Sequence, residues 1–239
     1  MSQEKDNEKA KVKVNEMHVP SIRGQLKKHI VHVPEIINEL TTGIKINEKL
    51  IKSLVFTTDI AIIRNMNGDA VIAVYPFTPQ PIITQAIMLA ADVPVFCGVG
   101  GGTTQGPRVV NLAKHAEYQG AIGVVVNSPT KNEVITEISQ VIDIPIILTV
   151  VSENTDIKNR IEAGATILNV SGAANTAKIV RKIRESFPYV PIIATGGPTE
   201  ETIRATIEAG ANAITYTPPT NGELFSELMK KYRDNENTI

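Results

Sequence analysis

The chain has 239 residues, of which 42% are hydrophobic and 21% are charged, so it is long enough for one large α/β domain. Its 24 basic and 25 acidic side chains give a net charge of −1, which argues against nucleic-acid and membrane partners. Cys97 is the single cysteine, which excludes an internal disulfide, and no apolar run reaches the roughly 18–20 residues that span a bilayer. We therefore expect a cytoplasmic protein.

The first 52 residues differ in pattern from the rest of the chain. Residues 1–16 alternate lysine with acidic residues, which predicts a disordered polar tail. Residues 17–52 form a predicted extension that packs on the main domain at 53–239. Within this extension, 33–40 fits a short helix, and 44–51 fits a hairpin that closes the bottom of the domain, as a plug or as an oligomer contact.

An internal repeat of roughly 44–52 residues runs through the main domain. Its three full copies open at Val93-Pro94, Ile144-Pro145 and Val190-Pro191, and a partial copy around Gly68 precedes them. One period is the length of two β-α units, and a strand at 53–58 completes eight units. The repeat predicts an α/β fold, a closed (β/α)8 TIM barrel, with an open doubly wound sheet as the alternative. The predicted helices cover 60–66, 81–90, 105–119, 132–142, 155–163, 175–187, 200–209 and 222–233.

Alternation along each predicted strand separates side chains that face the helices from those that face the barrel interior. The interior set becomes polar near the carboxyl end of each strand, where barrel enzymes bind their substrates. In the first two strands the same alternation points Val55, Asp59 and Tyr75 inward. In the third strand it points Cys97 outward, as a small buried core residue. The predicted substrate-binding residues are Thr57, Tyr75, Gly101, Gly102, Thr103, Asn127, Thr149, Asn169, Ser171, Thr195, Thr215 and Thr217.

Asp59 is the only ionisable side chain in this predicted polar set. A carboxylate at the mouth of a barrel is suited to act as a general acid or base, so Asp59 is the predicted catalytic residue. Its alternative role is the N-cap of the helix at 60–66, and one residue could fill both roles. The absence of lysine and histidine from the interior positions argues against Schiff-base chemistry and against a transition-metal site. No cofactor is evident, although Mg²⁺ that arrives with a substrate and FMN are left open.

Two glycine-rich loops follow predicted strands. Gly100-Gly101-Gly102 follows the third strand, where the lack of side chains lets backbone N–H groups approach a ligand. Gly196-Gly197 follows the seventh strand, and in this feature the chain resembles the phosphate-binding TIM barrels, which include sugar-phosphate epimerases and thiamine phosphate synthase. The resemblance covers the chain from about residue 53 to residue 232.

The resemblance implies that Gly196, Gly197, Asn221 and Gly222 bind a phosphate through backbone amides and a helix N-terminus. Pro198 and Pro218-Pro219 depart from the family pattern, and proline has no N–H to donate. The chain also looks like a set of bacterial proteins that carry only the general label of hydrolase. The matching stretches are 18–25, 74–81 and 98–103.

These observations predict a hydrolase that acts on a small polar metabolite, with or without a phosphate, and that assembles as a homo-oligomer. Three other functions stay open at this point. They are a lyase or isomerase of the phosphate-binding barrel type, an FMN-dependent oxidoreductase, and a metabolite sensor without catalytic activity. The charged N-terminal tail is the feature that favours the sensor.

Overall fold

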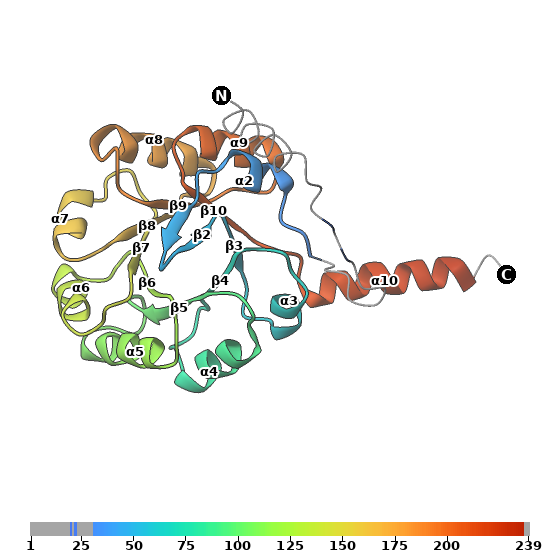
Figure 1. Cartoon of the computed structure of the whole chain (residues 1–239), viewed down its shortest axis with the longest axis horizontal. Helices are drawn as coiled ribbons and strands as arrows, with labels where there is room; N and C mark the ends of the chain where they lie inside the picture. The colour runs from blue at the N-terminus through green and yellow to red at the C-terminus, as the bar shows by residue number, and fades with distance from the viewer. Residues whose placement is uncertain (1–19, 21, 23–30, 237–239) are drawn as a thin grey trace, which may run out of the picture.

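A computed structural model describes residues 20, 22 and 31–236, so the predictions for the tail at 1–16 lie outside the described residues. Eight parallel strands close into a barrel in the order β10-β3-β4-β5-β6-β7-β8-β9 (Figure 1). The predicted TIM barrel is therefore confirmed. The strands are β3 Ser53–Phe56, β4 Ala70–Ala73, β5 Val95–Gly100, β6 Gly123–Val126, β7 Ile146–Val150, β8 Ile167–Val170, β9 Ile192–Thr195 and β10 Ala213–Tyr216.

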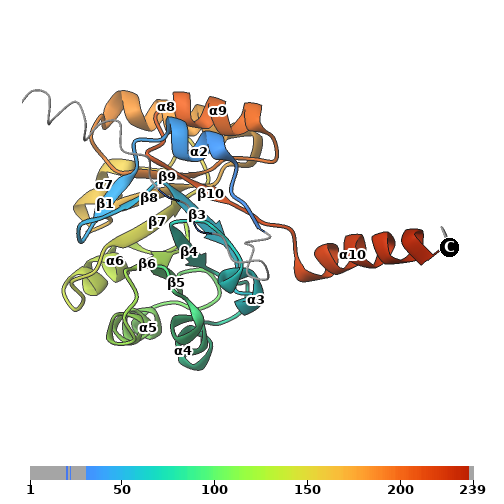
Figure 2. The ribbon, with the colours of Figure 1, turned by 45° about the vertical axis from the view of Figure 1, so that its right-hand side comes forward.

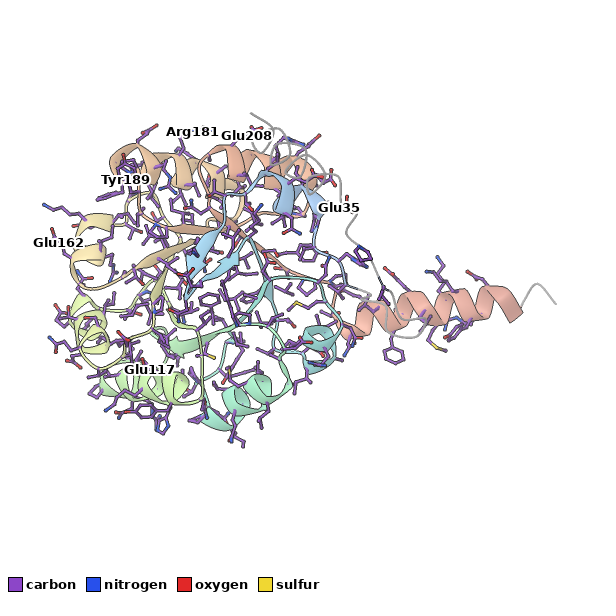
Figure 3. All side chains as sticks on the ribbon, viewed as in Figure 1. Glu35, Glu117, Glu162, Arg181, Tyr189 and Glu208 are labelled. Atoms are coloured by element: carbon purple, nitrogen blue, oxygen red, sulfur yellow. The ribbon has the colours of Figure 1, made fainter. Side chains whose placement is uncertain are left out.

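Helices follow the strands in alternation, and those from α3 to α9 form the outer ring of the barrel. They are α3 Ile60–Arg64, α4 Pro81–Ala90, α5 Pro107–Tyr118, α6 Asn132–Ser139, α7 Ile157–Glu162, α8 Thr176–Ser186 after a short 3-10 turn at Ala173–Asn175, α9 Glu200–Glu208 and α10 Asn221–Glu236. Charged side chains such as Glu162, Arg181 and Glu208 lie on the outside of this ring (Figure 3). None of the described helices is both long enough and apolar enough to cross a membrane.

The core has two layers because each strand buries both of its faces. The inner layer fills the barrel, with side chains such as Phe96 and Ile147, and the outer layer lies between strands and helices. No charged residue occurs on any of the eight barrel strands. Burial of an unpaired charge there would be costly, so the uncharged strands are consistent with the buried apolar layer inside the barrel.

The predicted direction of the side chains is correct for the six strands from β5 to β10 and wrong for β3 and β4. Leu54 and Ile72 belong to the inner layer, whereas Val55 belongs to the outer layer. For β4 the reason lies in Gly68, which differs from the glycines that follow α5, α7 and α9. Those glycines have φ between +94° and +118°, whereas Gly68 is not among the residues with positive φ. Gly68 therefore does not end a helix in the left-handed conformation, and the count from it to the strand is shifted by one residue.

The described part of the N-terminal extension packs on the barrel at two places. Helix α2 (Glu35–Leu40) lies against α9, and its Ile36 and Ile37 are buried in the outer layer. Ahead of it, Val31 pairs with Met66 just after α3, so this segment runs from α3 to α9 across the outside of the barrel. The antiparallel hairpin of β1 (Ile44–Ile46) and β2 (Lys49–Ile51) contributes Ile46 and Ile51 to the inner layer.

Helix α10 does not complete the ring. It leaves the barrel after Pro218-Pro219 and points away from it, as Figures 1 and 2 show from two directions. The segment that contains α2 runs instead from α3 to α9, with Val31 paired to Met66 and α2 packed against α9.

Candidate functional site

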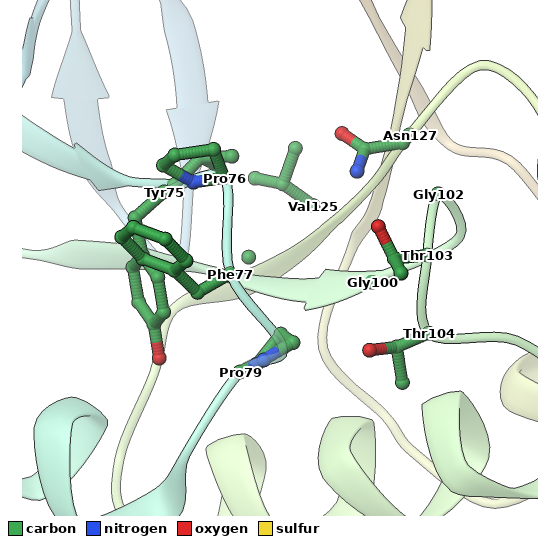
Figure 4. Close-up of a pocket in the computed structure, with 12 residues that line it drawn as sticks. Tyr75, Pro76, Phe77, Pro79, Gly100, Gly102, Thr103, Thr104, Val125 and Asn127 are labelled. Atoms are coloured by element: carbon green, nitrogen blue, oxygen red, sulfur yellow. The ribbon is translucent and has the colours of Figure 1, made fainter.

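A cleft with two lobes lies at the carboxyl ends of the strands, which is the side where TIM-barrel proteins hold their substrates. The lobes share Val74, Tyr75, Pro76 and Asn127, so they form one continuous cleft. The smaller lobe has a volume of about 100 Å³ and lies between the loop after β4 and the glycine loop after β5 (Figure 4). The larger lobe has a volume of about 570 Å³ and lies between the loop after β3 and the loop after β10.

Asp59 lines the larger lobe and is held from both sides. One carboxylate oxygen, Oδ1, accepts the backbone N–H groups of Ala61 (2.8 Å) and Ile62 (3.3 Å), so Asp59 is the N-cap of α3. The other oxygen, Oδ2, accepts the side-chain amide of Asn221 at 2.8 Å. Asp59 reaches the cleft although β3 ends at Phe56, because the chain turns at the strand end and the strand alternation no longer applies. The cap and a catalytic role are compatible, since Oδ2 can accept a further hydrogen bond.

The glycine loop after β5 is tightly folded. Gly100 and Gly101 have φ of +118° and +94°, and the Gly101 N–H donates to the carbonyl of Thr104 at 2.8 Å. The loop is fixed to the neighbouring loop because Asn127 N–H donates to the Gly100 carbonyl at 2.9 Å. A Cβ atom at Gly101 would overlap the hydroxyl of Thr130. Glycine is therefore required at Gly101 by both the backbone angle and the close approach of the second loop.

Four polar side chains face the interior at the carboxyl ends of β7 to β10. The strand register places Thr149 beside Asn169, and Thr195 beside Thr215. Asn169 and Thr215 are only 8% and 5% exposed. Among the described residues, neither Asn169 Oδ1 nor Thr215 Oγ1 has a hydrogen-bond partner. A buried polar atom without a partner costs about 1–3 kcal/mol, so these two oxygens mark a position where a polar ligand would be stabilised.

The structure brings the predicted substrate-binding residues together only in part. Those that line the two lobes are Thr57, Tyr75, Gly102, Thr103, Asn127 and Thr217. The tyrosine hydroxyl points away from Asn127 (Figure 4) and accepts the N–H of Gln80 at 2.8 Å, so the ring and not the hydroxyl faces the cleft. The other predicted side chains line neither lobe. Four of them face the barrel interior at the carboxyl ends of β7 to β10, namely Thr149, Asn169, Thr195 and Thr215, and Ser171 follows the end of β8.

The two loops predicted to bind a phosphate use part of their hydrogen-bonding groups within the protein. The Gly196 N–H donates to the Thr215 carbonyl at 3.3 Å, and Thr199 and Thr202 form a reciprocal capping box at the start of α9. Two carboxylates, those of Glu200 and Glu201, stand in the first turn of that helix. They complement the helix dipole and repel an anion.

At the start of α10, Glu223 uses the hydrogen-bond donors of Thr220. Its carboxylate accepts the N–H (2.7 Å) and the hydroxyl (2.8 Å) of Thr220, and these hydrogen bonds lower the pKa of Glu223. Asn221 uses its side chain on Asp59, and Gly222 is exposed on the helix. Phosphate binding by Gly196, Gly197, Asn221 and Gly222 stays a prediction, and the charge around both loops speaks against it.

No positively charged side chain contributes to the cleft. Neither lobe is lined by lysine or arginine. In the part of the chain that the structure describes, no group of three histidine, cysteine, aspartate or glutamate side chains is placed to hold a metal ion.

Sequence reasoning missed the apolar side of the cleft and the partner of Asp59. Phe56 and Val74 face the cleft because β3 and β4 have the opposite alternation to the one expected. The run Pro76-Phe77-Thr78-Pro79 after β4 was a usable signal, since two prolines in a loop indicate a rigid wall. Nothing in the sequence indicates that Asn221 binds Asp59, because the two residues are 162 positions apart.

Cys97 lies in the outer layer beneath the helices, as predicted. Burial raises the pKa of its thiol to about 12, so the reactive thiolate form is scarce at neutral pH. We expect the folded protein to resist modification by a chromogenic disulfide reagent at about pH 8, and one thiol per chain to react after denaturation. Rapid modification of the native protein would contradict this placement of Cys97.

Comparison with known proteins supports the fold and leaves the family open. No protein-family model matches the chain. A 4-hydroxy-tetrahydrodipicolinate synthase from Gluconacetobacter diazotrophicus is 25% identical over 163 residues, which cover 62% of this chain and 54% of that protein. The chain thus spans about half the length of the curated relative that it matches.

Two solved structures show the same barrel. A phosphoenolpyruvate phosphomutase from Streptomyces platensis subsp. rosaceus superimposes with a TM-score of 0.58 at 13% identity, over 77% of this chain and 81% of that chain. A 2,3-dimethylmalate lyase of the PEP mutase/isocitrate lyase superfamily gives a TM-score of 0.56 at 12% identity, over 84% of each chain. The fold and the cleft therefore define a TIM-barrel protein with a polar mouth.

Proposed function

We propose that the protein is a TIM-barrel lyase that acts on a small hydroxylated metabolite, with Asp59 as its general acid or base. The observation that carries the proposal is the pair of buried oxygens without partners, Asn169 Oδ1 and Thr215 Oγ1. A ligand hydroxyl can donate a hydrogen bond to the asparagine oxygen and accept one from the threonine hydroxyl. Such a ligand would remove both desolvation penalties at once.

The charge of the cleft supports an uncharged substrate over a phosphorylated one. Asp59 is the only acidic or basic residue among those that line the two lobes, tyrosine aside. A phosphate or a second carboxylate would lie near this carboxylate without a lysine or arginine to balance it. A polyol or a hydroxylated carbonyl compound meets no such repulsion.

The residues at the mouth support carbon chemistry through proton transfer. Asp59 can remove a proton from a substrate hydroxyl in the larger lobe. Thr215 lines neither lobe, so the proposal requires a substrate that extends from Asp59 into the barrel interior, where the Thr215 hydroxyl would stabilise negative charge on a carbonyl oxygen. No lysine lies on any barrel strand, so a Schiff base formed from those strands is not part of the proposal. Similarity to a lyase, a mutase and a synthase favours this reaction type over the hydrolysis expected from the sequence.

The first test uses the substitution Thr215→Val, which replaces the unpartnered hydroxyl by a methyl group of similar size. We expect the ligand-free variant to be more stable than the wild type by about 1 kcal/mol, because an unsatisfied buried group is removed. We also expect it to lose the thermal stabilisation that hydroxylated metabolites give to the wild type in a ligand screen. Denaturant unfolding measures the first effect, and one-dimensional proton NMR of the same mixtures detects any product.

Thr206→Val is the matched control. Thr206 is also a buried threonine, but its hydroxyl donates to the Thr202 carbonyl at 2.8 Å. We expect this variant to lose about 1 kcal/mol and to keep ligand binding. If Thr215→Val destabilised the protein as Thr206→Val does, or if it bound the metabolites like the wild type, the mouth would not be the proposed binding site.

A further inference from the structure

The larger lobe of the cleft has an apolar wall. The apolar residues that line it are Phe56, Ile62, Val74, Pro76, Pro218 and Pro219. Phe56 is 39% exposed, although the other three residues of β3 are buried. An aromatic side chain left open in a concave site offers apolar area to a ligand, so this wall is a candidate contact for part of the substrate.

Three of the polar side chains that line the same lobe already have hydrogen bonds within the protein. The Thr57 hydroxyl accepts the Asp59 N–H at 3.1 Å. The Thr220 hydroxyl donates to the Glu223 carboxylate at 2.8 Å and accepts the N–H of the same residue at 3.2 Å. The Tyr75 hydroxyl accepts the N–H of Gln80 outside the cleft. A hydroxylated group along this wall would lose hydrogen bonds to water and gain few from the protein, so the wall favours an apolar group.

The strand register places Phe56 above the buried oxygens that lack partners. Leu54 of β3 lies beside Thr215 of β10, and both side chains face the barrel interior. Phe56 follows Leu54 by two residues, so it faces the same side about 6.6 Å nearer the carboxyl ends of the strands. A ligand that binds Asn169 and Thr215 with its polar end therefore has its other end beside Phe56. Asp59 lines the same lobe.

The volumes of the two lobes indicate which one has room for a ring. A dry cavity of about 150 Å³ is enough to bind benzene. The larger lobe has a volume of about 570 Å³ and exceeds this size, whereas the smaller lobe has only about 100 Å³. The rings of Phe56 and Tyr75 both line the larger lobe, and aromatic rings attract one another in offset and edge-to-face contacts.

We propose that the substrate carries an aromatic ring, which lies in the larger lobe against Phe56, and that Phe56 determines this specificity. The hydroxyl and carbonyl groups next to the ring then reach Asp59 and the barrel interior. The inference rests on the proposed function, because it assigns the other end of the same substrate. It names an aryl-substituted hydroxycarbonyl compound as the substrate class.

Two hydroxyketones that differ in one group test the proposal. Hydroxyacetone carries a methyl group where α-hydroxyacetophenone carries a phenyl ring. We expect α-hydroxyacetophenone to bind the wild type at least about tenfold more tightly, because the ring is removed from water. Titration of the isotope-labelled protein followed by NMR measures both Kd values. The amide signals of residues 56–59 are expected to shift with the phenyl compound.

Variants at Phe56 test the contact itself. Phe56→Ala is expected to weaken α-hydroxyacetophenone by about tenfold and to leave hydroxyacetone unchanged, since only the ring loses its contact. Phe56→Leu keeps an apolar side chain and is expected to lose less. Phe225→Ala is the matched control, because Phe225 is an exposed phenylalanine that lines neither lobe. It is expected to change neither Kd, and circular dichroism checks that each variant is folded.

Thr215→Val separates this inference from the proposed function. It is expected to weaken both hydroxyketones by a similar factor, because it alters the polar end that they share. Equal binding of the two probes by the wild type, no binding of α-hydroxyacetophenone, or an equal effect of Phe56→Ala on both probes overturns the aromatic substrate class. If α-hydroxyacetophenone needs Phe56 but binds equally well to the Thr215→Val variant, the proposed function fails and the lobe keeps its preference for a ring.

Discussion

Replacement of Asp59 by asparagine is expected to lower kcat of the proposed lyase reaction by roughly 10²–10⁴-fold, the usual effect of losing a general acid or base. The melting temperature is expected to change little. Asparagine keeps a side-chain oxygen that can accept the amides of Ala61 and Ile62, so the cap on α3 is retained. Turnover of a metabolite identified in the ligand screen and thermal unfolding by circular dichroism provide the two measurements.

The matched control is Asp156→Asn. Asp156 is also an N-cap, with its carboxylate accepting the N–H of Asn159 at the start of α7, but it lines neither lobe of the cleft. We expect this variant to retain full turnover. A fully active Asp59→Asn variant would remove Asp59 from the mechanism, and the binding proposal for Asn169 and Thr215 would still stand on its own measurement.

Replacement of Gly101 by alanine is expected to destabilise the protein by roughly 3 kcal/mol. A non-glycine residue is strained at φ of +94°, and the new methyl group would overlap the Thr130 hydroxyl. That hydroxyl donates to the Asn127 carbonyl at 2.7 Å, so the clash also disturbs the residue shared by both lobes. Urea unfolding measures the loss of stability, and a weaker response in the ligand screen measures the loss of binding.

Gly106→Ala separates backbone strain from the clash. Gly106 has φ of +63°, but a Cβ atom there would meet no other atom within 4 Å. We expect this variant to lose about 1–2 kcal/mol from backbone strain and to bind ligands like the wild type. Equal losses in the two variants would mean that the loop of Asn127 and Thr130 moves aside without cost.

The fold was predictable because each repeat carries several signals that agree. An aliphatic-proline pair precedes a charge-free strand, and a Gly-Ala pair follows each helix in the copies around Gly120, Gly164 and Gly210. The copy around Gly68 has the glycine without the positive φ. One-residue differences in loop length reverse the direction of a strand's side chains, and a loop length cannot be read from composition.

The candidate site was predictable where it depends on strand alternation alone. Asn127, Asn169 and Thr215 face the interior as expected, because Asn169 and Thr215 lie on regular strands and Asn127 directly follows one. The cleft also depends on how loops fold over one another, and that part was missed. Neither the contact of Asn221 with Asp59 nor the turn of the Tyr75 hydroxyl away from the cleft follows from local sequence.

The segment of residues 31–40, which contains α2, affects how the sequence of this chain can evolve. Since β10 pairs directly with β3 and this segment packs between α3 and α9, the barrel does not depend on α10 for its closure. Substitutions after Leu224, which would unfold an ordinary barrel if they fell in its final helix, leave this barrel closed, whereas Asn221 and Leu224 remain tied to Asp59 and to the core. In the same way, a protein engineer could replace the helix after Leu224 and expect the barrel to stay folded.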